Sequence, residues 1–353
     1  MRRIMRARFW LSSCCLLVAL TTESRSAAYA DSLKRIVETS FRNAIVKIDV
    51  SSKIPVIRDG KNLCLSEGTG FLVSSSFVAS AGHVFELDPG CGELTIVLRS
   101  RRNNVERVAK LIESANDVAL LSVEEPFQSP MCFVTLMSDV FDIDGFRIGI
   151  PGGLQDPVPK EVVIGLDGEE WKPLVLLTPT PVEHGESGGP IIVDFNVVGI
   201  MKAKHMTYSG YSFMMKGSIL RNLMLKYKVP SNGQMCNPVT IRMVGNSASV
   251  QADSDLSPAD QSIVLNQIKK VVTEKKASVQ NKVQVNQVGS SVNISGGPQV
   301  IIRQHCTNIL FGQLCTSVPE MVYDPAAASA AANKVASEIR EQAAVELWSK
   351  LKN

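Results

Sequence analysis

The sequence lacks the short motifs that mark several classes of protein. No pair of cysteines has CxxC spacing, and no cysteine and histidine cluster has the spacing of zinc ligands. The 353 residues contain no glycine-rich nucleotide loop, no other metal motif and no internal repeat. The sequence therefore predicts no metal ion, no other cofactor and no repeat architecture.

A basic excess is also missing once residues 1–30 are set aside. The whole chain has 37 Lys and Arg against 34 Asp and Glu, a formal net charge of +3. Residues 1–30 hold five arginines and one glutamate, so the remainder has 32 basic and 33 acidic residues, a balance of −1. Charge therefore gives no reason to expect a nucleic-acid partner.

Residues 1–30 have the three regions of a secretory signal peptide. MRRIMRAR is positively charged, FWLSSCCLLVAL is short and apolar, and Ala28-Tyr29-Ala30 is a small-x-small cleavage site. We expect cleavage before Asp31 and export, to the periplasm or as a secreted protein. The apolar run is short for a membrane span and would leave with the signal peptide, so no stable span is expected after cleavage. An uncleaved anchor is the alternative.

Export would place the remaining cysteines in an oxidising environment, and their even number favours disulfides. Two of the eight cysteines lie in the signal peptide. The other six are Cys64, Cys91, Cys132, Cys236, Cys306 and Cys315. Connectivity does not follow from sequence alone; we expect the pairs Cys64–Cys91 and Cys306–Cys315, with free buried thiols as the alternative.

Short apolar runs alternate with turn residues from residue 44 to about residue 229. The runs are AIVKIDV, GTGFLVSS, ELTIVLRS, DVALLSV, FRIGIPGG, EVVIGL, PLVLLTPT, PIIVDFNVVGI and YSFMMKG. Gly, Pro, Asn and Asp separate them. Many short strands at this spacing favour a β-sandwich or barrel over a parallel α/β sheet.

One serine stands among glycines in the stretch HGESGGP, residues 184–190. Glycines on both sides of Ser187 allow a sharp turn in which consecutive N–H groups point at one spot. Such donors stabilise the oxyanion of an acyl-transfer reaction. We therefore expect Ser187 to be a nucleophile, with the N–H groups of Gly185 and Ser187 as the oxyanion hole. An ordinary turn is the alternative.

A serine nucleophile needs a base, and the chain has only four histidines: His83, His184, His205 and His305. His83 follows an apolar strand and begins a small-residue turn, so we expect it to be the base. His184 is three residues from Ser187, too close in sequence to reach the hydroxyl in the required geometry. Asp117, just before an apolar strand, is expected to accept the imidazole N–H and fix its tautomer. A structural histidine and an ordinary turn aspartate are the alternatives.

The blocks GTGFLVSSSFVASAGHVF, NDVALLSV and GESGGPIIVDFNVVGI resemble the catalytic blocks of the trypsin-like (chymotrypsin-fold) serine proteases. FRIGIPGG and YSFMMKGSILRNLM are similar to segments of the HtrA/Deg branch. The resemblance covers about residues 36–229. It implies an all-β protease domain of two six-stranded antiparallel β-barrels with a closing helix. It also implies that His83, Asp117 and Ser187 hydrolyse polypeptide substrates through an acyl-enzyme. A catalytically silent protein of this fold that binds peptides or partners is the alternative.

Two positions depart from the family's pattern. Glu186 precedes the serine, where the HtrA branch usually has asparagine and digestive trypsin-like enzymes have aspartate. Pro181 stands where trypsin carries the acid that selects basic side chains, so strict cleavage after Lys or Arg is not expected. We expect Pro181, His184, Lys202 and Lys204 to line the substrate pocket. The lysines would favour acidic groups there, and two solvated lysines are the alternative.

Glu186 raises the question of proteolytic activation. In trypsin-like zymogens the acid beside the serine pairs with a freshly cut N-terminal amine. KRIV, residues 34–37, resembles such a cutting site, although the glycines that normally follow are absent. The alternative is that residues 31–43 form a helix and that Glu186 contacts a neighbouring basic group or a backbone N–H.

Residues 230–353 lie beyond the resemblance. No carboxylate-binding loop of a PDZ domain is recognisable there, whereas VTIRMV, KVQVNQV and SVNIS predict strands, the last two exposed. Ser257-Pro258 and Asp324-Pro325 each predict the start of a helix. The apolar faces are Val264, Ile268, Val271 and Val272 in one helix and Ile339, Ala343, Leu347 and Leu351 in the other. We therefore expect a signal peptide (1–30), a protease domain (31–229) and an α+β extension of unknown function (230–353).

Overall fold

The structure of the protein is a computed structural model in which the chain divides into two compact units. The units are Met1–Asn237 with Leu351–Asn353, and Pro238–Lys350. The structure describes residues 31–100, 105–128, 143–152, 154–165, 174–177, 182–204, 211–230, 236–244, 247–279, 283–288, 291–296, 299–309, 312–322 and 325–352. The expected signal peptide lies outside these residues.

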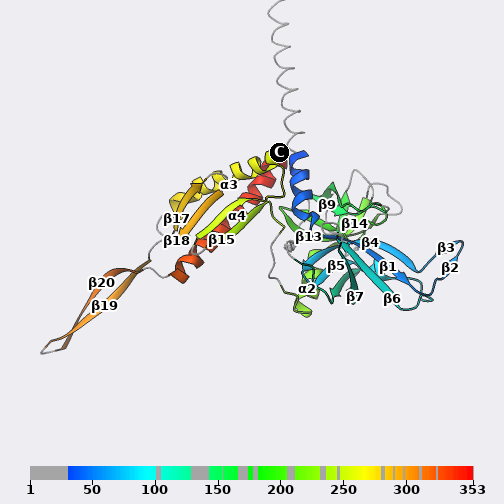
Figure 1. Ribbon diagram of the computed structural model, residues 1–353, viewed down its shortest axis with the longest axis horizontal. Coiled ribbons are helices and arrows are strands. Elements are labelled where there is room, and N and C mark those ends of the chain that lie inside the picture. The colour runs from blue at the N-terminus through cyan, green and yellow to red at the C-terminus, as the bar shows by residue number, and fades with distance from the viewer. Residues whose placement is uncertain are drawn as a thin grey trace, which may run out of the picture. The chain divides into compact units, whose positions relative to one another are not determined.

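Six antiparallel strands close into the first barrel (Figure 1). In ladder order they are β1 (Ile45–Ser52), β4 (Leu65–Ser74), β5 (Phe77–Ala81), β8 (Val118–Val123), β7 (Val105–Ala115) and β6 (Leu94–Ser100). Closure removes the unpaired strand edges that an open sheet would expose. Large apolar side chains such as Ile48, Leu72 and Leu98 are wholly buried.

A second closed barrel follows, and a helix comes directly after its strand β14. The barrel strands are β10 (Val158–Ile164), β11 (Leu174–Leu177), β14 (Tyr211–Lys216), β13 (Asn196–Lys204), β12 (Pro190–Val193) and β9 (Ile143–Gly149), and the helix is α2 (Gly217–Lys226). Its buried core includes Ile164, Ile191 and Met214. The expectation of two six-stranded antiparallel barrels with a closing helix is confirmed.

The run PIIVDFNVVGI forms two strands, β12 and β13, where the sequence analysis treated it as one run. Asp194 and Phe195 both have positive φ, 48° and 57°, between the paired residues Val193 and Asn196. A two-residue turn with positive φ at both positions matches the right-handed twist of the strands it joins. The serine loop is therefore followed at once by a tight hairpin.

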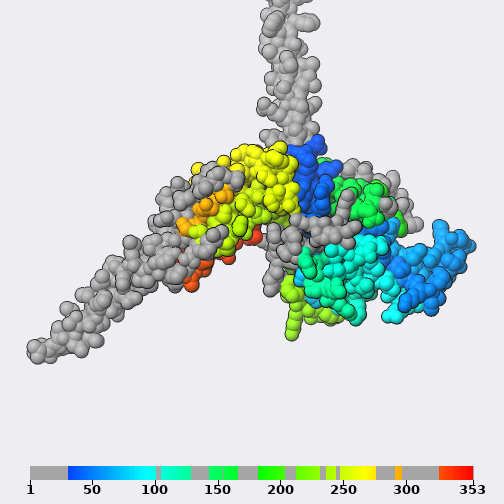
Figure 2. Space-filling model, in the orientation of Figure 1, coloured from blue at the N-terminus to red at the C-terminus, as the bar shows by residue number. Residues whose placement is uncertain are grey.

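A short hairpin, β2 (Ile57–Arg58) and β3 (Lys61–Asn62), projects from the first barrel (Figure 2). Near its base, Cys64 forms a disulfide with Cys91, a pairing that the sequence analysis names. Cys236 is disulfide-bonded as well. Cys132 and the side chains of Cys306 and Cys315 lie outside the description, although the backbone register places Cys306 opposite Cys315.

The unit Pro238–Lys350 contains a four-stranded antiparallel sheet in the order β15 (Val239–Val244), β16 (Ser247–Ala252), β18 (Ser291–Gly296) and β17 (Val283–Val288). Helix α3 (Pro258–Val279) contacts the last three of these strands, and Ser257 caps it by accepting the N–H of Asp260. Gln267 and Lys270 of α3 hydrogen-bond to Glu346 of α4 (Pro325–Lys352). Strands β15, β17 and β18 and both helices lie at the expected positions, whereas β16 was not expected from the sequence.

Two other features of this unit differ from the expectation. β18 is not an exposed strand, because Val292 and Ile294 are buried. A long hairpin, β19 (Gln299–Ile309) and β20 (Gly312–Val322), has no counterpart in the sequence analysis.

Candidate active site

His83 and Asp117 meet at one end of the first barrel. His83 lies in a single turn of 3-10 helix, η1 (Gly82–Phe85), directly after β5, and Asp117 lies in the turn before β8. β5 and β8 pair up to Ala81 and Val118, so the residues that follow and precede them are adjacent. The ring Nδ1 of His83 lies 3.0 Å from Oδ1 and 3.2 Å from Oδ2 of Asp117. The backbone N–H of His83 also donates to Oδ1, at 2.7 Å.

The Asp117 carboxylate is mostly enclosed, with 13% of its side chain exposed. Burial raises the pKa of the Asp117 carboxyl, but the hydrogen bonds and charge of His83, with the charge of Lys202, outweigh burial and lower that pKa below its ordinary value. Asp117 is therefore an anion at neutral pH. Such a carboxylate can orient the imidazole and stabilise its protonated form.

Ser187 lies in the loop before β12, and its neighbouring glycines are required by the backbone. Gly185 and Gly188 have φ of +89° and +91°, a region that residues with a side chain rarely adopt. The Ser187 hydroxyl donates to the carbonyl of Lys202 at 2.9 Å. In this structure the hydroxyl does not donate to the His83 ring. His83 is therefore hydrogen-bonded to Asp117 but not to Ser187.

The peptide group between His184 and Gly185 has a fixed direction. Its carbonyl oxygen accepts the N–H of Gly152 at 2.6 Å. In a trans peptide the C=O and N–H point in opposite directions, so the Gly185 N–H points away from Gly152. The next carbonyl, that of Gly185, accepts the Thr69 hydroxyl at 2.7 Å. The loop that carries the expected oxyanion donors is thus held by specific bonds.

Glu186 is wholly buried among basic groups. Its carboxylate lies 3.5 Å from Nη1 of Arg147 and 3.0 Å from Nζ of Lys160, and it accepts the N–H of Glu183 at 2.7 Å. Burial lowers the pKa of the equally buried Arg147 guanidinium, and the charge of Glu186 opposes that shift. Arg147 and Lys160 lie opposite each other on β9 and β10. The buried acid therefore has both a basic and a backbone partner.

The segment that resembles an activation site is helical. Residues 31–42 form a helix, in which Ile36 and Val37 have no exposed surface. The structure thus has the arrangement given as the alternative to activation, a first helix together with a Glu186 that contacts basic groups and a backbone N–H.

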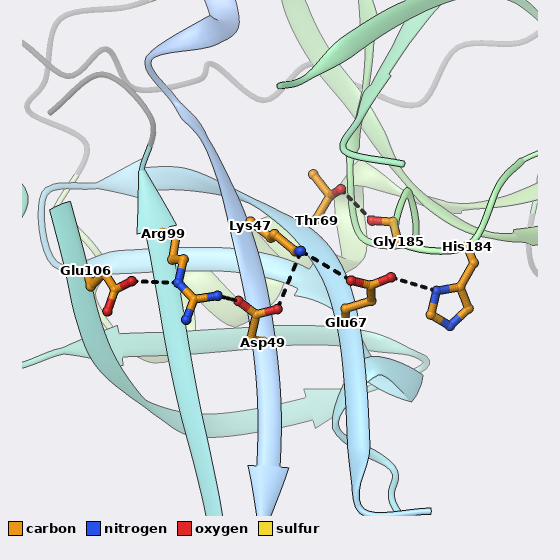
Figure 3. Close-up of polar contacts among 8 residues, drawn as sticks. All are labelled: Lys47, Asp49, Glu67, Thr69, Arg99, Glu106, His184 and Gly185. Atoms are coloured by element: carbon orange, nitrogen blue, oxygen red, sulfur yellow. Dashed lines mark hydrogen bonds and ion pairs between the residues drawn. The ribbon is translucent and has the colours of Figure 1, made fainter. Parts of the chain in front are cut away.

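His184 contacts the end of a series of charged side chains on the first barrel (Figure 3). Its Nδ1 lies 3.0 Å from Oε1 of Glu67, whose other oxygen lies 3.3 Å from Nζ of Lys47. Burial raises the pKa of Glu67, but the contacts with His184 and Lys47 together lower it below its ordinary value. Lys47 also forms an ion pair with Asp49, and Asp49 forms another with Arg99. His184 itself is largely exposed, at 80% of its side chain.

The other expected pocket residues are only partly described. Pro181 and His205 lie outside the described residues, as do the side chains of Lys204 and His305. The Lys202 ammonium lies 3.2 Å from Oδ2 of Asp117, a contact that the sequence did not suggest. Within the described ranges, no helix is long and apolar enough to cross a membrane, and no group of His, Cys, Asp and Glu could hold a metal ion.

Sequence reasoning missed several residues that support the loop. They are Thr69, Glu67, Arg147 and Lys160. Thr69 had one visible signal, its place in the GTGF block, whereas the other three are charged residues in ordinary strand sequence.

Comparisons with known proteins agree with this arrangement. Residues 68–200, which include His83, Asp117 and Ser187, match the model of the trypsin-like peptidase domain. No curated protein matches the chain.

Similar solved structures include the active and inactive forms of the Rv3671c protease from M. tuberculosis, each 20% identical to this chain. The match to the active form covers 56% of this chain and 88% of the chain of that structure, with a TM-score of 0.41. The inactive form covers 54% and 92%, with a TM-score of 0.40. The match over residues 68–200 and the two closed barrels show that this chain contains a trypsin-like peptidase domain of the chymotrypsin fold.

Proposed function

We propose that the protein is an exported serine endopeptidase that uses His83, Asp117 and Ser187. The observation that carries the proposal is the double contact of the His83 ring with Asp117, next to a glycine loop that presents Ser187. The same contact leaves Nε2 of His83 as the ring nitrogen that accepts a proton. Cleavage of residues 1–30 before Asp31 would deliver the mature enzyme, which N-terminal sequencing of exported protein tests.

In the proposed reaction, Ser187 Oγ attacks the carbonyl carbon of a peptide bond while its proton passes to Nε2 of His83. The carbonyl oxygen becomes an oxyanion that accepts the N–H groups of Gly185 and Ser187. His83 then gives the proton to the departing amine, and an acyl-enzyme remains on Oγ. Water, deprotonated by His83, hydrolyses this ester and restores the serine.

The resting position of the Ser187 hydroxyl requires one movement first. Oγ donates to the Lys202 carbonyl at 2.9 Å, so a rotation about χ1 must bring it to His83 before attack. Catalytic hydrogen bonds are often absent or long before substrate binds. The rotation is therefore compatible with the proposed role.

The decisive experiment is labelling of mature protein, beginning at Asp31, with an active-site fluorophosphonate. Wild type should be labelled, Ser187→Ala should not, and the exposed Ser254→Ala should be labelled like wild type. Thermal unfolding of each variant shows whether it is folded. Cleavage of denatured polypeptide by wild type and its absence in Ser187→Ala would then establish endopeptidase activity.

A second candidate function is a catalytically silent protein that binds peptides. The observation in its favour is the same bond from Ser187 Oγ to the Lys202 carbonyl, which leaves His83 and Ser187 unconnected. Folded wild-type protein that takes up no fluorophosphonate but binds peptides would support this candidate and contradict the enzyme.

A further inference from the structure

Thr69 of β4 forms hydrogen bonds with the loop that carries Ser187 and with Ile150, just after β9 of the second barrel. Its side chain has no exposed surface. Its N–H donates to the carbonyl of Ser187 at 2.8 Å, and its hydroxyl donates to the carbonyl of Gly185 at 2.7 Å. The same hydroxyl accepts the N–H of Ile150, at 2.8 Å. Figure 3 shows Thr69 on the first barrel pointing at Gly185.

The Thr69 hydroxyl also helps to hold the peptide group between His184 and Gly185 from its other side, through the His184 carbonyl. Ile150 comes two residues before Gly152, whose N–H holds the His184 carbonyl. By bonding to Ile150, Thr69 holds the segment from which Gly152 reaches the loop. The carbonyls before and after the Gly185 N–H are therefore both fixed, one by Thr69 directly and the other through this segment.

We infer that Thr69 is a positioning residue for the oxyanion hole, acting from the first barrel on a loop of the second. Two glycines with positive φ give the loop many backbone conformations in the absence of outside contacts. The bonds of Thr69 select one of these conformations. The inference rests on the proposed function, in which the Gly185 N–H receives the oxyanion.

A hydroxyl is suited to this position because the same oxygen atom can donate one hydrogen bond and accept another. Valine has nearly the shape of threonine but neither function. In Thr69→Val the Gly185 carbonyl and the Ile150 N–H would each lose a buried partner, which is costly unless the loop moves to find others. Serine retains the hydroxyl and loses only a methyl group.

The test compares Thr69→Val with Thr69→Ser in steady-state peptide hydrolysis. We expect Thr69→Val to lower kcat about tenfold to a hundredfold with KM changed less than about threefold, because the oxyanion donors act in the transition state. Thr69→Ser should stay within about threefold of wild type. Thr95→Val on β6 is the control for the same substitution elsewhere in the barrel.

Amide hydrogen exchange of residues 182–189 supplies a readout that does not depend on activity. Exchange should become faster in Thr69→Val and stay unchanged in Thr69→Ser and Thr95→Val. If wild type proves inactive, the proposed function fails while exchange still tests the Thr69 contact.

Three results would overturn the inference. They are an unchanged kcat in folded Thr69→Val, unchanged exchange of the loop in that variant, and a Thr69→Ser enzyme as impaired as Thr69→Val. Should Thr69→Val not fold, Thr69→Cys replaces it, because a thiol is a weak donor of similar size and should give an intermediate kcat. A wild-type kcat in Thr69→Cys would then count against the inference.

Discussion

Lys202 forms an ion pair with Asp117, with 3.2 Å between Nζ and Oδ2. The main-chain carbonyl of the same lysine accepts the Ser187 hydroxyl. One residue of β13 therefore contacts both ends of the proposed triad. From the sequence, Lys202 is expected in the substrate pocket. We propose that its ammonium also supports Asp117.

The first prediction concerns this ion pair and pH. Because the pKa of Asp117 is lowered by folding, its contribution to stability is present above its unfolded pKa of about 3.9 and is lost as pH falls through the folded pKa. Lys202→Met should lower the free energy of unfolding at pH 7, by at most about 1 kcal/mol since the lysine is partly exposed. The difference from wild type should be smaller at a pH below about 3.9, and it should shrink further as the pH falls through the folded pKa of Asp117.

Urea unfolding at the two pH values measures this difference. Lys53→Met, at an exposed position between β1 and β2, is the control for loss of a lysine charge. An equal loss of stability at both pH values would show that Lys202 acts through packing of its carbon chain and not through Asp117.

The second prediction concerns cooperation between Ser187 and His83. Ser187→Ala and His83→Ala should each remove nearly all peptidase activity, and the double variant should lose little more, because either change disables the same proton-coupled attack. Single-turnover kinetics with excess enzyme measures the residual rates. Losses that multiply in the double variant would mean that the two residues act independently.

The sequence allowed prediction of the parts of the site that depend on local blocks. Ser187 could be placed because a serine among glycines describes its own backbone geometry, and the barrels because their strands are short apolar runs. β7 was missed because its sequence, VERVAKLIESA, is charged and largely exposed. The hairpin of β19 and β20 was missed because it lies in residues 230–353, where no resemblance helped.

The support of Glu186 could not be predicted for a different reason. Arg147 and Lys160 are ordinary charged residues in the sequence, thirteen positions apart. Only the register of β9 against β10 places them opposite each other, beside the same carboxylate. A partner set by strand register leaves no local pattern in the chain.

The third prediction concerns the disulfide between Cys64 and Cys91. It links the segment between β3 and β4 to the segment before β6, joining two cysteines 27 positions apart in the sequence and enclosing the His83 block. Reduction, or Cys64→Ser with Cys91→Ser, should lower the free energy of unfolding by about 2–4 kcal/mol. Urea unfolding with and without reductant measures this. Peptide mapping that finds both thiols free in exported protein would remove the basis of the prediction.

The fourth prediction concerns the buried pair of Arg147 and Glu186. Glu186→Gln leaves the fully buried guanidinium without its carboxylate, and removing one partner of a buried pair typically costs about 3–5 kcal/mol. Adding Arg147→Met removes the buried guanidinium charge itself and should recover part of that loss. Urea unfolding of the single and double variants forms a double-mutant cycle. Additive losses would mean that the two charges are not coupled.

The last prediction concerns activation. Glu186 already contacts Arg147 and Lys160, and Ile36 is buried within a helix. We therefore expect that the proposed oxyanion loop needs no new N-terminal amine. Purified protein beginning at Asp31 should be fully labelled by a fluorophosphonate without further cutting. A cut between Arg35 and Ile36, made through an introduced protease site, should lower thermal stability because it breaks the helix of residues 31–42. It should not increase labelling. Increased labelling after the cut, abolished by Glu186→Gln, would instead show that Ile36 replaces a basic side chain as the partner of Glu186.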